Sequence, residues 1–279
     1  MSSVRRLVLT ASPADAPGPA GTPEGVPEGA ERVAADGLVG WRFLSDAWAA
    51  APDPGPGWAA LTLPEDATAN PHPLVVTDVD STLIQQEVIE LLAAHAGREA
   101  EVAEVTERAM RGELDFAQSL HARVEALAGL PVGVVEEVVD AVRPTDGALE
   151  LIAAVHAAGG RVCAVSGGFT SVLAPLAAAW GLHAYCANEL EAADGRLTGR
   201  VVGTVVDRAA KAAMLRAWAA DAGVAETAVV AVGDGANDID LLTAAGCGVA
   251  LCAKPALREH ADVVLDVPSF TPLRWLLGL

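Results

Sequence analysis

One short stretch, residues 74–83, constrains the fold of this chain more than any other. It reads Leu-Val-Val-Thr-Asp-Val-Asp-Ser-Thr-Leu, so an apolar, β-branched run ends in two acidic residues that one valine separates. The run predicts a short buried strand, and Asp78 and Asp80 follow where that strand passes into a loop. In open parallel sheets, ligands bind outside the carboxyl ends of the strands, so we expect the chemistry of the chain here.

The region that follows has the pattern of a parallel α/β protein. Four helical segments without an intervening strand, at 83–96, 99–110, 115–127 and 131–142, predict a small helical cap over about 85–143. From Asp146 onward, strands and helices alternate, and residues 189–206 predict a hairpin that turns at Asp194-Gly195. The predicted strands are 161–166, 184–187, 228–232, 248–251 and 263–265, and the predicted helices are 147–158, 170–180, 208–222, 237–245 and 272–277. The fold class we predict is α/β, a doubly wound parallel sheet with a helical cap inserted after the first core strand.

Residues 1–73 differ from the rest of the chain in composition. They hold 11 of the 17 prolines, and the stretch from Pro13 to Gly29 has little to bury, which predicts disorder or an extended linker. The apolar residues at 38–50 and a strand pattern at 58–63 are too few for an independent core. We therefore expect a Pro/Gly-rich, partly disordered N-terminal extension at 1–73 and one α/β domain at 74–279.

Bulk properties exclude some partners. The formal net charge of −19 argues against nucleic acid, because nucleic-acid binding depends on basic patches that displace counterions. No apolar run reaches the roughly 18 residues that a membrane span needs. The four cysteines show no CxxC spacing, which favours free thiols and a soluble, cytoplasmic protein. A small phosphorylated substrate remains compatible with this charge, and the oligomeric state stays open.

Polar clusters follow three of the predicted strands, and a lysine precedes one of those strands. The clusters are Asp78 with Asp80, then Ser166-Gly167-Gly168, then Gly233-Asp234-Gly235-Ala236-Asn237-Asp238, and the lysine is Lys211. Two carboxylates supply the hard oxygen ligands that Mg²⁺ prefers, glycines let backbone N–H groups approach a phosphate, and a lysine neutralises its charge. One aspartate can attack phosphorus while the other exchanges protons. The set predicts metal-assisted phosphoryl transfer, although each motif alone also suits a turn, a helix cap or a solvated helix face.

These motifs resemble a known family. The order Asp78-x-Asp80-x-Thr82, Ser166, Lys211 and Gly233-Asp234-Gly235-x-x-Asp238 is that of the haloacid-dehalogenase-like superfamily. Within it, the chain resembles the phosphoserine phosphatase family from about Leu74 onward. That resemblance rests on Glu87, on residues 104–116, on Ser-Gly-Gly-Phe at 166–169 and on Ala-Asn-Glu-Leu at 187–190.

The resemblance implies a catalytic centre. Asp78 is expected to be the nucleophile and Asp80 the proton donor and acceptor. Mg²⁺ is expected on the Asp78 carboxylate, the Asp80 backbone carbonyl and the Asp234 carboxylate. The residues expected to hold the phosphoryl group are Ser166, Gly167 and Lys211.

The resemblance also implies a substrate pocket. Glu87 is expected to face the substrate ammonium and Arg123 its carboxylate, which a guanidinium can grip through two hydrogen bonds. Met110 and Phe116 are expected to shield the pocket, and Asn237 to touch substrate beside the metal. Without the family spacing, Glu87 and Arg123 would each pass as an ordinary charged residue on a helix surface.

The implied function is that of a phosphoserine phosphatase, which hydrolyses O-phospho-L-serine to L-serine and phosphate through an aspartyl-phosphate, the last step of L-serine biosynthesis. Two alternatives remain at this point. One is a phosphotransferase, or a phosphatase for another small phosphomonoester, on the same scaffold. The other is a non-enzymatic signalling module that stores a phosphoaspartate, which Asp80 disfavours because an acid/base beside the nucleophile hastens hydrolysis.

Overall fold

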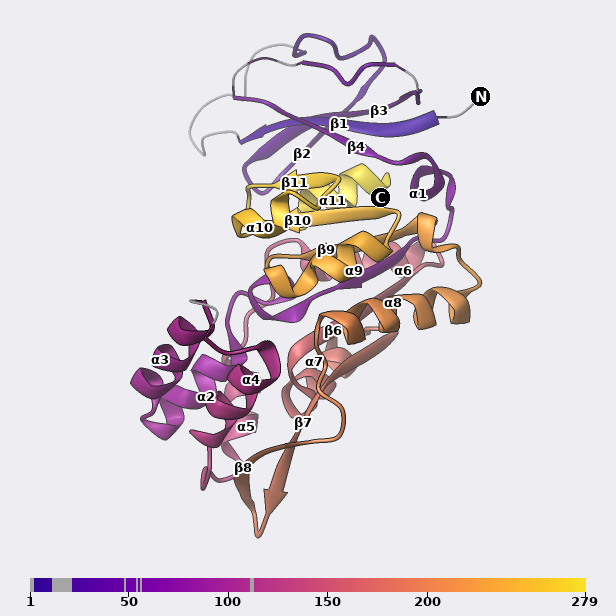
Figure 1. Ribbon diagram of the computed structural model, residues 1–279. Coiled ribbons are helices and arrows are strands. Elements are labelled where there is room, and N and C mark those ends of the chain that lie inside the picture. Colours follow the sequence, from indigo (N-terminus) through magenta and orange to yellow (C-terminus); the bar gives the residue numbers. More distant parts are fainter. Residues whose placement is uncertain (1–2, 12–21, 48, 54, 56, 111–112) are drawn as a thin grey trace.

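A seven-stranded sheet forms the centre of the molecule, in the order β11-β10-β9-β5-β6-β7-β8 (Figure 1). The computed structural model describes residues 3–11, 22–47, 49–53, 55, 57–110 and 113–279. The strands are β5 (Leu74–Thr77), β6 (Arg161–Phe169), β7 (Ala184–Ala193), β8 (Arg196–Val202), β9 (Val229–Gly233), β10 (Cys247–Leu251) and β11 (Val263–Leu265). All neighbours pair in parallel except β7 and β8, which form the predicted hairpin. The predicted parallel α/β fold is thus confirmed.

Helices cover both faces of this sheet. One face packs against α6 (Ala148–Ala157), α7 (Thr170–Trp180) and α11 (Thr271–Leu277), and the other against α8 (Arg208–Ala222), α9 (Ile239–Ala244) and α10 (Pro255–Arg258). Strand side chains point alternately to the two faces, so Val75 joins the first apolar cluster while Leu74 and Val76 join the second. Strand β5 is therefore buried on both sides, and it holds the loop that carries Asp78 and Asp80 at the middle of the sheet.

Four helices lie between β5 and α6, in the interval where the cap is expected. They are α2 (Val88–Ala96), α3 (Glu99–Met110), α4 (Phe116–Glu125) and α5 (Val134–Ala141). The predicted helix start at residue 83 is wrong. Residues Val79–Leu83 form a separate π-helical turn in which Ser81 has a φ of +54°, and α2 begins only at Val88. The Asp80 carboxylate accepts the Val88 N–H (2.8 Å), which caps α2 and holds the intervening loop.

The N-terminal region contains a second sheet. Its strands are β1 (Ser3–Ala11), β2 (Glu31–Ala35), β3 (Leu38–Asp46) and β4 (Ala59–Leu63), antiparallel in the order β2-β3-β1-β4, followed by α1 (Glu65–Ala69). We expected one strand, at 58–63, in a partly disordered extension; the described residues instead form four strands, so the expectation of a single strand is wrong. Leu7, Leu9 and Leu63 share an apolar cluster with α11, so one face of this sheet is buried against the α/β domain (Figure 1).

The predicted linker is only partly within the described residues. Residues 13–21 lie outside them, whereas 22–29 form two turns closed by hydrogen bonds from Val26 to Pro23 and from Ala30 to Pro27. Among the described helices, none combines the length and the apolar character that crossing a bilayer requires. All four cysteines are free, as predicted; Cys163 and Cys247 are buried, but Cys252 is exposed.

Candidate active site

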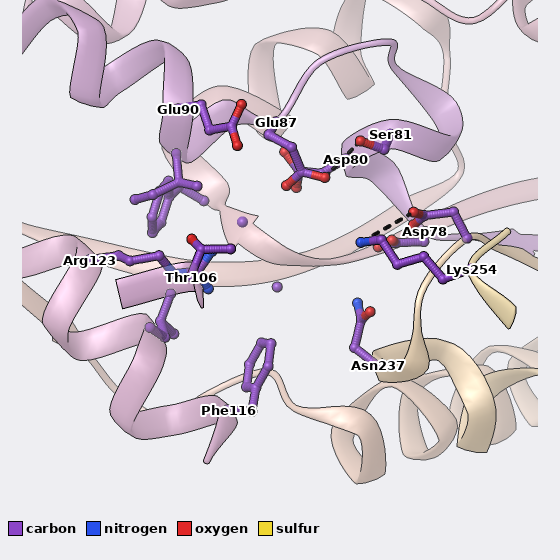
Figure 2. Close-up of a pocket in the computed structure, with 16 residues that line it drawn as sticks. Asp78, Asp80, Ser81, Glu87, Glu90, Thr106, Phe116, Arg123, Asn237 and Lys254 are labelled. Carbon is purple, nitrogen blue, oxygen red and sulfur yellow. Dashed lines mark hydrogen bonds and ion pairs between the residues drawn. The ribbon is translucent and has the colours of Figure 1, made fainter. Parts of the chain in front are cut away.

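A cavity of about 400 Å³ opens between the carboxyl ends of the central strands and the helical cap (Figure 2). Its floor comes from the end of β6 and from the loops after β5, β9 and β10, and its far wall from α2, α3 and α4. The lining residues are Asp78, Asp80, Ser81, Glu87, Ile89, Glu90, Thr106, Phe116, Leu120, Arg123, Gly167, Gly168, Phe169, Asp234, Asn237 and Lys254. The cavity therefore has an acidic floor and a wall that carries two carboxylates, a guanidinium and apolar side chains.

Asp78 and Lys211 form a buried ion pair at the floor. The Lys211 ammonium has no exposed surface, and it donates to Asp78 at 2.6 Å and to Asp238 at 2.7 Å. Lys211 reaches this position from the first turn of α8, whose start is capped by the Asp207 carboxylate. Burial alone would lower the pKa of Lys211, but the two carboxylates raise it well above its ordinary value. The lysine is therefore a fixed positive charge.

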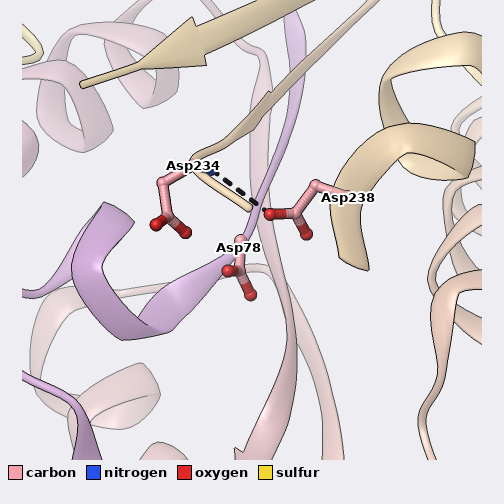
Figure 3. A group of neighbouring side chains, drawn as sticks. All are labelled: Asp78, Asp234 and Asp238. Carbon is pink, nitrogen blue, oxygen red and sulfur yellow. Dashed lines mark hydrogen bonds between the residues drawn. The ribbon is translucent and has the colours of Figure 1, made fainter. Parts of the chain in front are cut away.

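Asp78, Asp234 and Asp238 form a carboxylate cluster, in which one oxygen of each lies within 4.8 Å of the others (Figure 3). Asp238 is fully buried, and its second oxygen accepts the N–H groups of Asp234 and Gly235, each at 3.2 Å. Burial, followed by repulsion from Asp238, raises the pKa of both Asp78 and Asp234. Three carboxylates balanced by one lysine leave an excess of negative charge that suits a divalent cation.

Asp80 points away from this cluster. Its Oδ1 accepts the Val88 N–H at 2.8 Å, and its Oδ2 accepts the Ser166 hydroxyl at 2.9 Å. Burial raises the pKa of Asp80, and those two hydrogen bonds oppose the rise only in part. A carboxyl group that holds its proton more readily than usual, two residues from Asp78, is suited to general acid catalysis.

The end of β6 lies at the floor of the cavity, where Gly167 and Gly168 line it. A Cβ on Gly168 would lie 2.7 Å from Asp80 Oδ2 and one on Gly167 would lie 2.9 Å from the Phe116 ring, so a larger residue at either position would force its neighbour to move. The Gly168 N–H donates to the Ser166 Oγ at 2.7 Å. The Ser166 hydroxyl therefore connects the end of β6 to Asp80.

The cap wall carries opposite charges. Glu87 accepts the Ser81 hydroxyl at 2.7 Å, and burial, followed by repulsion from Asp80, raises its pKa to about 7. Arg123 is partly buried, and among the described residues only its Nε has a hydrogen-bond acceptor, the Ser119 carbonyl at 3.3 Å. Both side chains line the cavity, Glu87 next to Asp80 and Ser81, and Arg123 next to Thr106 (Figure 2). The terminal nitrogens of Arg123 are therefore available to a ligand.

Residues 75–243 match the family model of the haloacid dehalogenase-like hydrolases. The chain belongs to this hydrolase family. It is 59% identical over 206 residues to a phosphoserine phosphatase of Streptomyces coelicolor, a match that covers 74% of this chain and half of that protein. A solved substrate-bound phosphoserine phosphatase is 41% identical, with a TM-score of 0.68 over 74% of this chain and 97% of its own. These matches place the chain with the phosphoserine phosphatases of the hydrolase family.

Another hydrolase of this family shares the whole architecture. A crystal structure from Salmonella enterica matches 99% of both chains with a TM-score of 0.83 at 24% identity. That match includes the N-terminal sheet, so the combination of this sheet with the hydrolase domain is a recurring fold. The low identity limits the comparison to the fold.

Most residues that the sequence nominated meet in this cavity, but not all can be placed. Asn237 lines the cavity, whereas the side chain of Met110 lies outside the described residues. Two residues at the site had no individual role assigned from the sequence: Asp238, which belongs to the last motif, and Lys254, whose ammonium lies 4.0 Å from Asp234. Lys254 follows β10, so the rule that ligands bind at strand ends would have identified it.

Proposed function

We propose that this chain hydrolyses O-phospho-L-serine to L-serine and phosphate, the last step of L-serine biosynthesis. One observation carries the proposal: a single cavity is lined by Asp78, whose carboxylate the buried Lys211 holds, and by the Glu87 and Arg123 side chains. The first pair suits a phosphoryl group and the second suits the ammonium and carboxylate of an amino acid. The chain spans half the length of its Streptomyces relative, so the activity of the whole protein is part of the proposal. Free thiols support a cytoplasmic location.

The phosphoryl transfer follows from the positions of two aspartates. A carboxylate oxygen of Asp78 attacks phosphorus, and the bond from phosphorus to the serine oxygen breaks. Asp80 gives its proton to that leaving oxygen, and then takes a proton from the water that attacks the aspartyl-phosphate. The buried, proton-retaining state of Asp80 supports the first of these roles. Lys211, Ser166 and Gly167 hold the phosphoryl oxygens throughout.

We further propose that Mg²⁺ binds at the Asp78 and Asp234 carboxylates and the Asp80 backbone carbonyl. The donor set supports this assignment, because it consists of hard oxygen atoms and the cluster carries excess negative charge. Asp238 contributes by holding Lys211 and the backbone of Asp234. When bound, Mg²⁺ would neutralise charge on the transferring phosphoryl group.

A phosphate-release screen over small phosphomonoesters, with and without Mg²⁺, tests the function. We expect phosphoserine to be the preferred substrate over phosphothreonine, sugar phosphates and p-nitrophenyl phosphate. Asp78→Asn should abolish turnover and phosphoenzyme formation, whereas the exposed Asp221→Asn serves as a matched control with normal activity. A preference for another phosphomonoester would leave the chemistry but remove the substrate. Wild-type turnover in Asp78→Asn would refute the nucleophile.

The lifetime of the phosphoenzyme separates the proposed hydrolase from the signalling alternative. A storage module would keep its phosphoaspartate for hours, whereas the proposed hydrolase should release it within seconds because Asp80 activates water. Quenching the reaction at intervals and measuring acid-stable phosphoprotein distinguishes the two.

A further inference from the structure

Asn188 is a fully buried polar residue beside the catalytic floor, and the proposed mechanism does not use it. It lies in β7 with 1% of its surface exposed. Its Nδ2 donates to the Gly167 carbonyl at 2.8 Å, and its Oδ1 accepts the Val206 N–H at 2.8 Å. The partners fix the orientation of the amide, since a carbonyl only accepts and an N–H only donates. One side chain therefore joins the phosphate-binding loop to a segment 39 residues further on.

The first hydrogen bond has a specific cause in the sheet. β6 and β7 pair regularly up to Val165 and Cys186, and then the register shifts until Phe169 lies opposite Asn188. Residues 166–168 therefore bulge out of the ladder, which turns their backbone toward the cavity. A carbonyl in such a bulge next to the core loses its hydrogen-bond donor on the neighbouring strand and needs another donor. The Asn188 amide supplies that partner for Gly167, and so fixes the plane of the Gly167–Gly168 peptide.

The second hydrogen bond, to Val206, anchors the segment that leads into α8, the helix that carries Lys211. Val206 directly precedes Asp207, whose carboxylate caps α8 by accepting the Ala210 N–H at 2.8 Å. The Lys211 N–H in turn donates to the Asp207 carbonyl at 2.9 Å, so Lys211 lies one turn from this anchor. Asn188 thus sets the distance between two groups that face the phosphoryl site from different elements.

We propose that Asn188 is a positioning residue for phosphoryl transfer, holding the Gly167–Gly168 peptide and the start of α8 in register around the phosphoryl group. The inference rests on the proposed function, since it concerns the phosphoryl end of the same site. It predicts that only an amide of this length suits the position. Aspartate keeps the acceptor for Val206, but its carboxylate cannot donate to the Gly167 carbonyl.

The test compares Asn188→Asp and Asn188→Ala with the wild type and with Ser269→Ala. Ser269 is a suitable control because it is buried and its Oγ accepts a backbone N–H, that of Thr271 at 3.1 Å, outside the cavity lining. Two kinetic readouts are used with Mg²⁺: inhibition by inorganic phosphate, and kcat/KM for phosphoserine and for p-nitrophenyl phosphate. Thermal unfolding of each variant reports stability separately.

For Asn188→Asp we expect phosphate inhibition to weaken about tenfold or more and kcat/KM to fall about 10- to 100-fold, because small displacements of positioning groups carry large kinetic costs. The fall should be equal for both substrates, because the cap wall is untouched. Ser269→Ala should lose stability but keep wild-type kinetics. A folded Asn188→Asp with wild-type phosphate inhibition and turnover would overturn the inference, as would loss of folding in both variants.

Failure of the proposed function gives a different result. If the wild type hydrolyses p-nitrophenyl phosphate but not phosphoserine, the substrate assignment fails, and the Asn188 comparison proceeds on p-nitrophenyl phosphate. If the wild type hydrolyses neither substrate, the role of Asn188 is tested by calorimetric titration of the Mg²⁺-containing proteins with inorganic phosphate. Equal phosphate affinity in wild type and Asn188→Asp would then overturn the inference.

Discussion

Replacing Glu87 with glutamine should stabilise the metal-free protein, and should do so only at neutral and alkaline pH. The folded state raises the pKa of Glu87 from its ordinary value of 4.5 to about 7, chiefly through burial and then through repulsion from Asp80. A carboxyl group with a raised pKa stabilises the fold fully below its unfolded pKa, and this contribution is lost as the pH rises through its folded pKa. Glutamine does not ionise, so the variant escapes that loss.

The magnitude follows from the pKa difference. Between 4.5 and about 7, at about 1.4 kcal/mol for each pKa unit, the free energy of unfolding changes by about 3 kcal/mol. Glutamine keeps an oxygen for the Ser81 hydroxyl, so the 2.7 Å hydrogen bond survives the substitution. Relief of the Asp80 repulsion changes the titration of Asp80 as well, which makes 3 kcal/mol an upper value. We expect about 2–3 kcal/mol at pH 8 and close to zero at pH 4.5.

Urea unfolding in the presence of a chelator at pH 4.5, 6 and 8 measures this effect. The control is Glu90→Gln, which removes an exposed carboxylate of the same helix and the same cavity. Glu87→Gln should also lose about 100-fold in kcat/KM for phosphoserine, but little for p-nitrophenyl phosphate, which has no ammonium group. The difference in free energy of unfolding between the wild type and Glu87→Gln isolates the titration of Glu87. If that difference were the same at all three pH values, the reasoning would be refuted.

Three further substitutions test the floor of the site. Lys211→Met should cost about 3–5 kcal/mol at pH 8, measured by urea unfolding, because it leaves the Asp78 and Asp238 carboxylates buried without a counter-ion. The cost should be smaller at lower pH, because burial already raises the pKa of Asp78 and a proton can then replace the lost positive charge. Asp238→Asn should raise the Mg²⁺ concentration for half-maximal activity about tenfold, measured by metal titration, because the Asp234 backbone loses a charged acceptor. Gly168→Ala should lower kcat about 100-fold without unfolding the protein, as checked by circular dichroism, since its Cβ meets the Asp80 carboxylate.

The central fold could be predicted because its sequence signals are local. A strand buried on both faces is a continuous apolar run, and β5 and β9 are short runs of this kind. Helices such as α7 and α8 stop just before Gly181 and Gly223, which adopt positive φ. Because glycine is the residue that most readily adopts this conformation, its presence in the sequence marks the end of each helix. The rule that parallel strands present their carboxyl ends at one edge then brought Asp78, Ser166 and Asp234 to one place.

Other features depend on distant partners. The N-terminal strands bury Leu7 and Leu63 against α11, more than 200 residues further along the chain, so their own composition underestimates their packing. Helix α2 begins at Val88 and not at residue 83 as predicted, because the Asp80 carboxylate caps it across a loop, and periodicity contains no sign of that hydrogen bond. The role of Asp238 depends on its distance from Lys211, which sits 27 positions away.

The electrostatics of the cavity connect these observations. Asp78, Asp80, Glu87 and Asp234 all have raised pKa values, with burial as the largest cause in each case. A chain selected for stability alone would replace such carboxylates or pair each with a cation, since unpaired buried charge is costly. The ligands of the proposed reaction carry the missing positive charge, as a divalent cation at the floor and an ammonium at the wall. The same buried negative charge therefore destabilises the ligand-free protein and attracts a cationic ligand. A cation that binds only the folded state raises the free energy of unfolding and so offsets the cost of burying these carboxylates.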